Sequence, residues 1–131
     1  MTAPDRRKVA SEWMDRASHD WETAVQLIKS GRYHPDVVST LIQQAMEKYL
    51  KGYLISEGWE LERTHNLERL CKLASGYDKG FRKYIDLCIV VGDYYMSERY
   101  PPLAEEELTE KEVLRAYRSA ERFLRFLLKN R

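Results

Sequence analysis

The sequence predicts an all-α fold, an antiparallel helical bundle of four long helices plus one short helix. Apolar residues recur at three- and four-residue steps in five segments, which is the spacing of an α-helix. No segment alternates apolar and polar residues as a half-buried strand does. With 131 residues, of which 44% are hydrophobic and 33% charged, the chain has the size and composition of a single domain, 1–131, that buries one core.

The most apolar segment is 37–55, VVSTLIQQAMEKYLKGYLI, and we expect it at the centre of the bundle. Its apolar residues cover most of the circumference of a helix, so several neighbouring helices must pack against it. The polar residues set into this surface are Gln43, Gln44, Glu47, Lys48 and Lys51. Lys48 projects within about 20° of the apolar Leu41. A lysine in that place extends to water, pairs with a carboxylate or serves a binding site.

A first helix is expected at about 5–30, ended by Gly31. Its apolar stripe consists of Val9, Trp13, Ala17, Trp21, Ala24 and Ile28. Asp20 falls close to this stripe, where it either faces water or a nearby lysine, or pairs with Lys48 across the interface with the next helix. Because the turn at 31–35 is short, the first two helices should form an antiparallel hairpin.

Two helices are expected in the middle of the chain. The short one covers 66–74, and either Thr64 or Asn66 caps it. The next covers about 78–96. Its stripe consists of Phe81, Tyr84, Ile85, Cys88, Val91 and Tyr95. Cys71 and Cys88 both lie in apolar helical stripes, which favours buried hydrophobic side chains over a metal site or a disulfide framework.

The last helix is expected at 110–129, opened by a capping box of Thr109 and Glu112 after the extended Pro101-Pro102 segment. Its apolar stripe consists of Val113, Tyr117, Ala120, Phe123, Leu124 and Leu127. Its opposite face carries six cations, Lys111, Arg115, Arg118, Arg122, Arg125 and Lys129. Two interpretations stay open for this basic face. It is either the solvated side of an amphipathic helix, or a surface for nucleic acid or an acidic partner.

Charge and composition limit the function classes. The net charge is +1 and the sequence pI is about 7.8, so any attraction to phosphate must come from local clustering. We expect no cofactor and no metal, because the glycines are scattered and His19, His34 and His65 include no pair at metal-ligand spacing. No segment resembles a signal peptide or a membrane span, which predicts a cytoplasmic protein without a membrane partner.

Two polar features are candidates for chemistry. His65 lies at the start of the short helix, where it is either an acid or base near neutral pH or a histidine satisfied by capping bonds. Arg99 stands in the segment 94–101, YYMSERYP, among tyrosines and before two prolines. It is either part of a device for anions and stacked bases, or a group that satisfies carbonyls where its helix ends.

Four motifs in sequence order resemble the HEPN domain in its small stand-alone prokaryotic form. They are Ala17-x-x-Asp20-x-x-x-Ala24, Gln43-Gln44-Ala45-x-Glu47-Lys48-x-x-Lys51, His65-Asn66-Leu67-x-x-Leu70 and Tyr95-x-x-x-Arg99-Tyr100-Pro101. The resemblance spans almost the whole chain. It implies an up-and-down bundle with a short extra helix, a homodimer, and a minimal nucleotidyltransferase as partner in a toxin–antitoxin-type pair.

The same resemblance implies that the protein binds a nucleotide or RNA. On this hypothesis the ligand-binding residues are Lys48, Lys51, His65, Arg99 and Tyr100. Arg99 and the two lysines would hold phosphate and Tyr100 would stack on a base.

Some HEPN relatives are metal-independent ribonucleases in which a histidine follows an arginine after four to six residues. Here Ala104, Glu105 and Glu106 stand at that distance from Arg99, so the usual pair is absent. The alternatives to a binding module are therefore a ribonuclease with a degenerate site of His65 and Arg99, and a purely structural dimeric scaffold.

Overall fold

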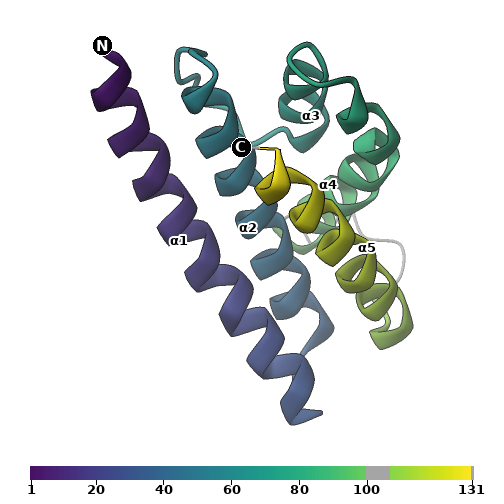
Figure 1. Cartoon of the computed structure of the whole chain (residues 1–131). Helices are drawn as coiled ribbons and strands as arrows, with labels where there is room; N and C mark the ends of the chain where they lie inside the picture. Colours follow the sequence, from purple (N-terminus) through teal and green to yellow (C-terminus); the bar gives the residue numbers. More distant parts are fainter. Residues whose placement is uncertain (100–106, 131) are drawn as a thin grey trace.

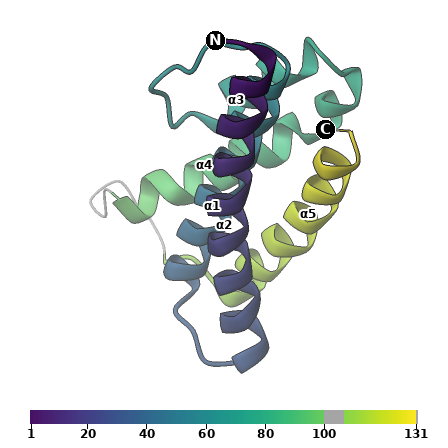
Figure 2. The ribbon, with the colours of Figure 1, turned by 60° about the vertical axis from the view of Figure 1, so that its left-hand side comes forward.

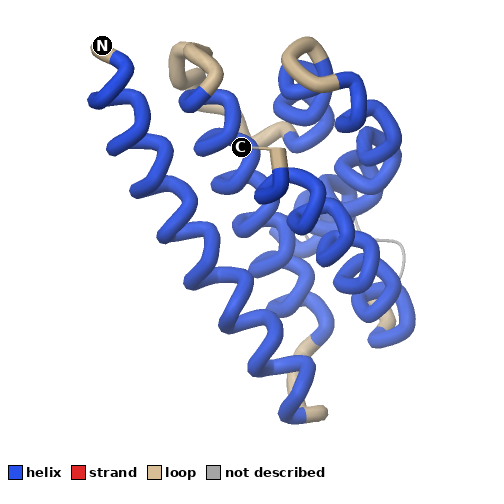
Figure 3. Tube along the Cα trace, viewed as in Figure 1, coloured by secondary structure: helices blue, strands red, loops and turns tan. Residues whose placement is uncertain are grey.

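A computed structural model describes residues 1–99 and 107–130, with side chains described for 1–94 and 107–130. The elements in order are α1 (Ala3–Ser30), α2 (Pro35–Ser56), α3 (Leu67–Ser75), the 3-10 helix η1 (Lys79–Tyr84), α4 (Ile85–Arg99) and α5 (Glu110–Lys129). Figure 3 shows helices joined by loops throughout this described part, without a strand. The prediction of an all-α fold is confirmed.

α1 and α2 form the antiparallel hairpin that the short turn predicts (Figure 1). Gly31 ends α1 in the left-handed conformation, with φ of 69°, and its N–H donates to the carbonyl of Ile28 at 3.2 Å. Small residues bring the two helices close together. A Cβ added at Gly52 would lie 3.1 Å from the backbone oxygen of Ala10. A larger residue at position 52 would therefore push α1 away from α2.

α2 is the centre of the fold, as its all-round apolar sequence predicts. It contacts each of the other four α-helices. Its buried apolar side chains include Ile42, Met46, Leu50 and Leu54, all at 0% exposure. In Figure 2, α1 lies in front of α2, on which it packs, with α5 beside them and α4 running obliquely to the pair. The polar residues of α2 are consequently carried into the interior together with the apolar ones.

Only some of the residues predicted for the apolar stripe of α1 are buried. Ala17 and Ala24 are completely buried, but Trp13 and Trp21 stay partly exposed, and Met14 is buried in their place. The reason is that α1 packs mainly against one helix, α2, so small side chains fill the contact and large rings lie at its edges. Trp21 there stacks on Tyr117 of α5, with ring centroids 5.1 Å apart.

The predicted helix at 78–96 is divided in the structure. It begins as the 3-10 helix η1, and α4 then continues to Arg99. The carboxylate of Asp78 accepts a hydrogen bond from the N–H of Gly80 at 2.8 Å, which favours a tight first turn. Gly80 also lies against the ring of Phe126, because a Cβ added at Gly80 would overlap the ring at Cζ. This close contact is a tertiary feature that helical periodicity does not reveal.

The two cysteines are free and buried, which confirms their interpretation as small core side chains. Cys71 comes from α3 and Cys88 from α4, and the Sγ of Cys71 donates to the carbonyl of Phe81 at 3.4 Å. The hydrogen bond with Cys71, and then burial, raise the pKa of the Cys88 thiol. Cys88 is therefore an inert thiol at neutral pH.

α5 begins with the predicted capping box. The hydroxyl of Thr109 accepts from the N–H of Glu112, and the carboxylate of Glu112 accepts from the N–H of Thr109, both at 3.1 Å. The buried stripe includes Val113, Ala120 and Phe123, with Ala116 buried and Tyr117 at its edge. None of the helices in the described residues is long and apolar enough to cross a membrane.

Candidate functional site

The carboxylate of Glu47 lies at the centre of a buried polar cluster on α2. Its side chain is 4% exposed and that of Lys51 is 5% exposed. Lys51 Nζ donates to Oε2 of Glu47 at 2.9 Å, and Gln43 Nε2 donates to Oε1 at 2.9 Å. Positions 43, 47 and 51 are four residues apart, so they share one face of the helix. The cluster is therefore built by the local sequence of α2 and buried by its neighbours.

His65 joins this cluster from the surface. Its Nδ1 lies 3.1 Å from both carboxylate oxygens of Glu47, while its side chain is 68% exposed. An ionised carboxylate only accepts hydrogen bonds, so Nδ1 carries the hydrogen and donates it. The neutral ring then has its lone pair on Nε2. The side chain of Asn66 caps α3 by accepting from the N–H of Arg69 at 3.0 Å, which fixes the chain beside His65.

Lys51 has a second partner on α1. Its Nζ lies 5.3 Å from the centroid of the Trp13 ring, within the range of a cation–π interaction. Gln44 extends the network by donating from Nε2 to Oε1 of Gln43 at 3.0 Å. The ammonium group of Lys51 is thus enclosed by a carboxylate and an indole ring.

Lys48 points away from this cluster and pairs with Asp20 of α1. Its Nζ lies 2.6 Å from Oδ2 of Asp20, and the two side chains are 24% and 22% exposed. The interhelical pair, one of the two alternatives open for Asp20, is therefore present. The structure brings together Lys51 and His65, through Glu47, but engages Lys48 in a separate ion pair.

The two other residues of the predicted ligand set are Arg99 and Tyr100. α4 ends at Arg99, but the side chain of Arg99 is outside the described residues, and so is the whole of Tyr100. Their proposed contacts with phosphate and base stay predictions.

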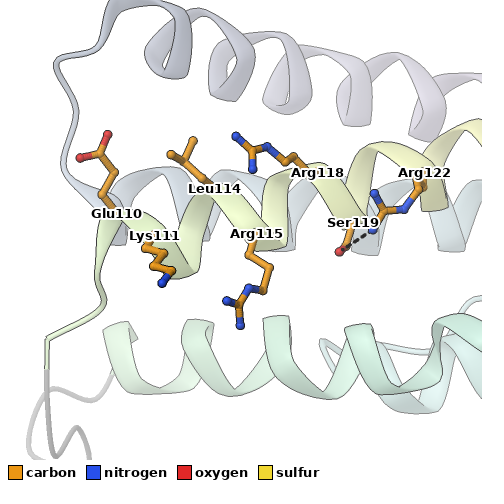
Figure 4. A pocket seen from close by; sticks show the side chains of 7 residues that line it. All are labelled: Glu110, Lys111, Leu114, Arg115, Arg118, Ser119 and Arg122. Carbon is orange, nitrogen blue, oxygen red and sulfur yellow. Dashed lines mark hydrogen bonds between the residues drawn. The ribbon is translucent and has the colours of Figure 1, made fainter.

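The basic face of α5 forms a shallow groove of about 450 Å³ (Figure 4). It is lined by Glu110, Lys111, Leu114, Arg115, Arg118, Ser119 and Arg122. In Figure 4, Leu114 and Arg118 project toward α1, whereas Lys111 and Arg115 project from the other side of α5, where α4 lies. The groove thus carries four cations and one carboxylate within residues 110–122 of one helix.

The cations of this groove are exposed and little neutralised. Lys111, Arg115 and Arg118 form no ion pair within 4 Å in the part of the chain that is described. Arg122 Nη2 donates to the hydroxyl of Ser119 at 3.1 Å. The carboxylate of Glu110 accepts from the hydroxyl of Tyr33 at 3.0 Å. Arg125 differs, because it pairs with Glu121 at 3.2 Å and lies outside the groove lining.

The pKa values of two residues close to the groove, Glu112 and Tyr94, are shifted by their neighbours. The N–H and hydroxyl of Thr109 donate to Glu112 and hold the pKa of its carboxyl below the ordinary value. Burial, followed by the charge of Glu112, raises the pKa of the Tyr94 hydroxyl.

Among the described residues, no three His, Cys, Asp or Glu side chains gather as a group that would hold a metal ion.

A family model described as the HEPN domain matches residues 10–131 of the chain. The chain belongs to the HEPN domain family. At the level of the family, this membership supports a nucleotide- or RNA-related module. A comparison with curated proteins gave no match.

The fold of this HEPN domain is similar to that in the crystal structure of TT1696 from Thermus thermophilus. The two chains are 23% identical, and the match covers 92% of this chain and 96% of TT1696 with a TM-score of 0.72. At this level of identity the likeness shows a common fold.

Sequence reasoning about this HEPN domain singled out Glu47 as a polar residue of the central helix but did not assign it to the ligand-binding set. Lys51 and His65 were predicted as ligand-binding residues, but Glu47, which joins them, was not. The four-residue spacing of Gln43, Glu47 and Lys51 was the available signal. It predicts a shared helix face but does not tell whether that face is buried.

Proposed function

We propose that this HEPN domain binds a phosphate-bearing ligand, a nucleotide or RNA, in the basic groove of α5. The observation that carries the proposal is the set of four exposed cations, Lys111, Arg115, Arg118 and Arg122, beside the single carboxylate of Glu110. With a net charge of only +1 for the whole chain, this local excess of cations attracts a polyanion where the overall charge would not.

The groove is a better candidate for phosphate than the lysines of α2. The ammonium group of Lys51 is buried against Glu47, and that of Lys48 is held by Asp20 at 2.6 Å. A phosphate would have to displace a carboxylate from either lysine, whereas the guanidinium groups of Arg115 and Arg118 face solvent. Arg99, Tyr100 and His65 remain proposed as a second contact region, tested by nucleotide titration of Arg99→Ala.

The partner proposal rests on the family resemblance. We propose that the domain forms a homodimer and pairs with a minimal nucleotidyltransferase in a toxin–antitoxin-type system. Light scattering of the purified protein measures the first part. Co-purification of a tagged chain with the nucleotidyltransferase encoded beside it, if there is one, measures the second. A monomer that retains no such protein would contradict both parts.

The binding proposal is tested with the triple variant Arg115→Ala/Arg118→Ala/Arg122→Ala. Its affinity for single-stranded RNA should fall by about tenfold or more at low salt. The slope of log K against log salt should also decrease by about 0.7 for each phosphate contact that is lost. Fluorescence anisotropy with a labelled oligonucleotide measures both quantities.

A matched variant separates local binding from net charge. Arg7→Ala/Lys8→Ala/Arg16→Ala removes the same number of cations from exposed positions of α1. It should leave the affinity within about twofold of wild type, because none of these three cations lines the groove. Equal losses in the two triple variants would refute a site in the groove and leave only non-specific attraction.

A second candidate function is metal-independent cleavage of RNA by His65. It is favoured by the contact between Glu47 and Nδ1 of His65, because a carboxylate that holds this nitrogen leaves Nε2 ready to accept a proton. His65 would remove the proton from a ribose 2′-hydroxyl, whose oxygen attacks the adjacent phosphorus and displaces the 5′-oxygen. The leaving 5′-oxygen would take a proton from water, and His65 would return its own proton to solvent. Glu47 would act as a positioning residue.

This candidate predicts products with 2′,3′-cyclic phosphate ends when RNA is incubated with the protein and a chelator. His65→Ala should abolish the products. If wild type and His65→Ala leave the same set of RNA fragments, His65 does not cleave RNA and the domain is a binding module. If the arginine variants then also bind RNA as wild type does, the domain is a structural scaffold.

A further inference from the structure

An aromatic pair closes the seam between α1 and α5. The rings of Trp21 and Tyr117 have centroids 5.1 Å apart and planes 18° from parallel. Both side chains remain partly exposed, whereas Ala17 and Ala24, one turn to either side of Trp21, are completely buried. The ring pair therefore lies at the solvent edge of the helix contact. Each ring covers one face of the other.

This ring pair adjoins the basic groove of α5. Tyr117 directly precedes Arg118 and stands three residues after Leu114, and both of those residues line the groove. Residues three apart on a helix are neighbours on its surface. Figure 4 shows Leu114 and Arg118 projecting toward α1, the helix that carries Trp21. Aromatic and cationic surfaces thus meet on the α1 side of the groove.

The charge around the ring pair is compatible with a phosphate ligand. Burial, and then the charge of Glu121 on α5, raise the pKa of the Tyr117 hydroxyl. Glu121 is paired with Arg125 at 3.2 Å, so its charge is partly neutralised. The guanidinium of Arg118 lies in no described ion pair and is free to meet a phosphate.

We propose that Trp21 and Tyr117 form a stacking subsite for an unpaired nucleobase whose phosphates lie on Arg118 and Arg122. The inference rests on the proposed function and adds a second point of recognition to the same ligand. Every nucleobase has a flat surface that stacks on an indole or phenol ring. Bases inside a duplex are covered on both faces, so the subsite selects single-stranded segments.

The test compares two probes of equal charge. One is a short single-stranded polyadenylate RNA, and the other is an abasic ribose–phosphate oligomer of the same length. Wild type should bind the RNA about tenfold more tightly, which is the effect of stacking one or two bases on an aromatic ring. Trp21→Leu should remove this preference and leave the affinity for the abasic oligomer unchanged. Trp21→Phe, which keeps an aromatic ring, should retain part of the preference.

A control on the same helix is Trp13→Leu, eight residues earlier, where the ring contacts Lys51 and not the groove. It should keep the full preference for RNA. If Trp21→Leu also keeps the full preference, the stacking subsite is refuted. If instead the arginine triple variant binds both probes as wild type does, the proposed function of the groove is wrong, which is a different result.

A second measurement covers the case in which Trp21→Leu does not fold. The chain has three tryptophans, so Trp13→Phe/Trp59→Phe leaves Trp21 as the single indole. Its fluorescence should be quenched on addition of the polyadenylate RNA and unaffected by the abasic oligomer. Equal responses to the two probes would overturn the subsite.

Discussion

Glu47 and His65 are eighteen residues apart in the sequence, and the carboxylate of one lies 3.1 Å from Nδ1 of the other. Glu47 is buried and His65 is mostly exposed. This contact joins the interior of the bundle to its surface, because the same carboxylate also holds Lys51 and Gln43. The state of Glu47 therefore affects both the stability of the core and the orientation of a surface imidazole.

Glu47→Gln should reduce the free energy of unfolding by about 3 kcal/mol, because the charge of Lys51 stays buried without a carboxylate. Urea denaturation followed by circular dichroism measures the change. The double variant Glu47→Leu/Lys51→Met removes both charges and should recover most of the loss. A single variant as stable as wild type would argue against a buried ion pair.

The ion pair of Asp20 and Lys48 should contribute much less to the free energy of unfolding than the pair of Glu47 and Lys51. Both side chains are about a quarter exposed, and partly solvated ion pairs are typically worth about 1 kcal/mol or less. A double-mutant cycle with Asp20→Asn and Lys48→Met should give a coupling energy of that size that decreases at high salt. A coupling that is large and independent of salt would mean that the pair is more deeply buried than its exposure indicates.

Gly80→Ala should destabilise the fold by about 2 kcal/mol, because the new methyl group would overlap the ring of Phe126. The loss should be smaller when the same change is made together with Phe126→Leu. Gly92→Ala is the matched control, since its added Cβ meets no described atom within 4 Å. In the interior of α4 it should raise stability by about 0.5 kcal/mol. Thermal unfolding of wild type, the three single variants and the Gly80→Ala/Phe126→Leu double variant tests the comparison.

Alkaline unfolding should involve Tyr53. Burial, and then the charges of Glu57 and Asp78, raise the pKa of its hydroxyl from 10.0 to about 12. A pKa that is raised in the folded state contributes stability below the unfolded value, and this stability is lost as the pH rises through the folded value. Stability should therefore decrease between pH 10 and 12.

The variant Tyr53→Phe should flatten this part of the pH profile. Tyr77→Phe, which changes a phenol that is 49% exposed, should flatten the profile less, because the charge of Tyr77 is the smallest of the four contributions to the raised pKa of Tyr53. Guanidinium denaturation at a series of pH values measures the slopes. Identical slopes in wild type and Tyr53→Phe would contradict the role of Tyr53.

Some features of the fold were predictable because they depend on short stretches of sequence. The capping box of Thr109 and Glu112, the end of α1 at Gly31 and the central place of α2 follow from local hydrogen bonds and helical periodicity. The burial of individual α1 residues was not predictable in the same way. The stripe containing Trp13 and Trp21 satisfied the periodicity, but only the packing of α1 on α2 decided that alanines and Met14 fill the contact.

The candidate site shows the same division. The sequence placed cations on one face of α5, and it placed Lys48 and Lys51 among apolar residues of α2. It did not tell that one lysine pairs across the helix interface with Asp20 while the other is enclosed by Glu47 and Trp13. The two lysines have the same side chain and neighbouring positions, and they differ in the helices that surround them.

The sequence by itself therefore determined that the chain is all-α, where most of its helices begin and end, and which residues share a helix face. These properties depend on neighbours within about four residues. The tertiary structure decided that Glu47 reaches His65, that Trp21 stacks on Tyr117 beside the arginines of α5, and that Gly80 meets Phe126. Each of these contacts joins different elements, and its geometry depends on how the helices pack, which periodicity within one helix does not specify.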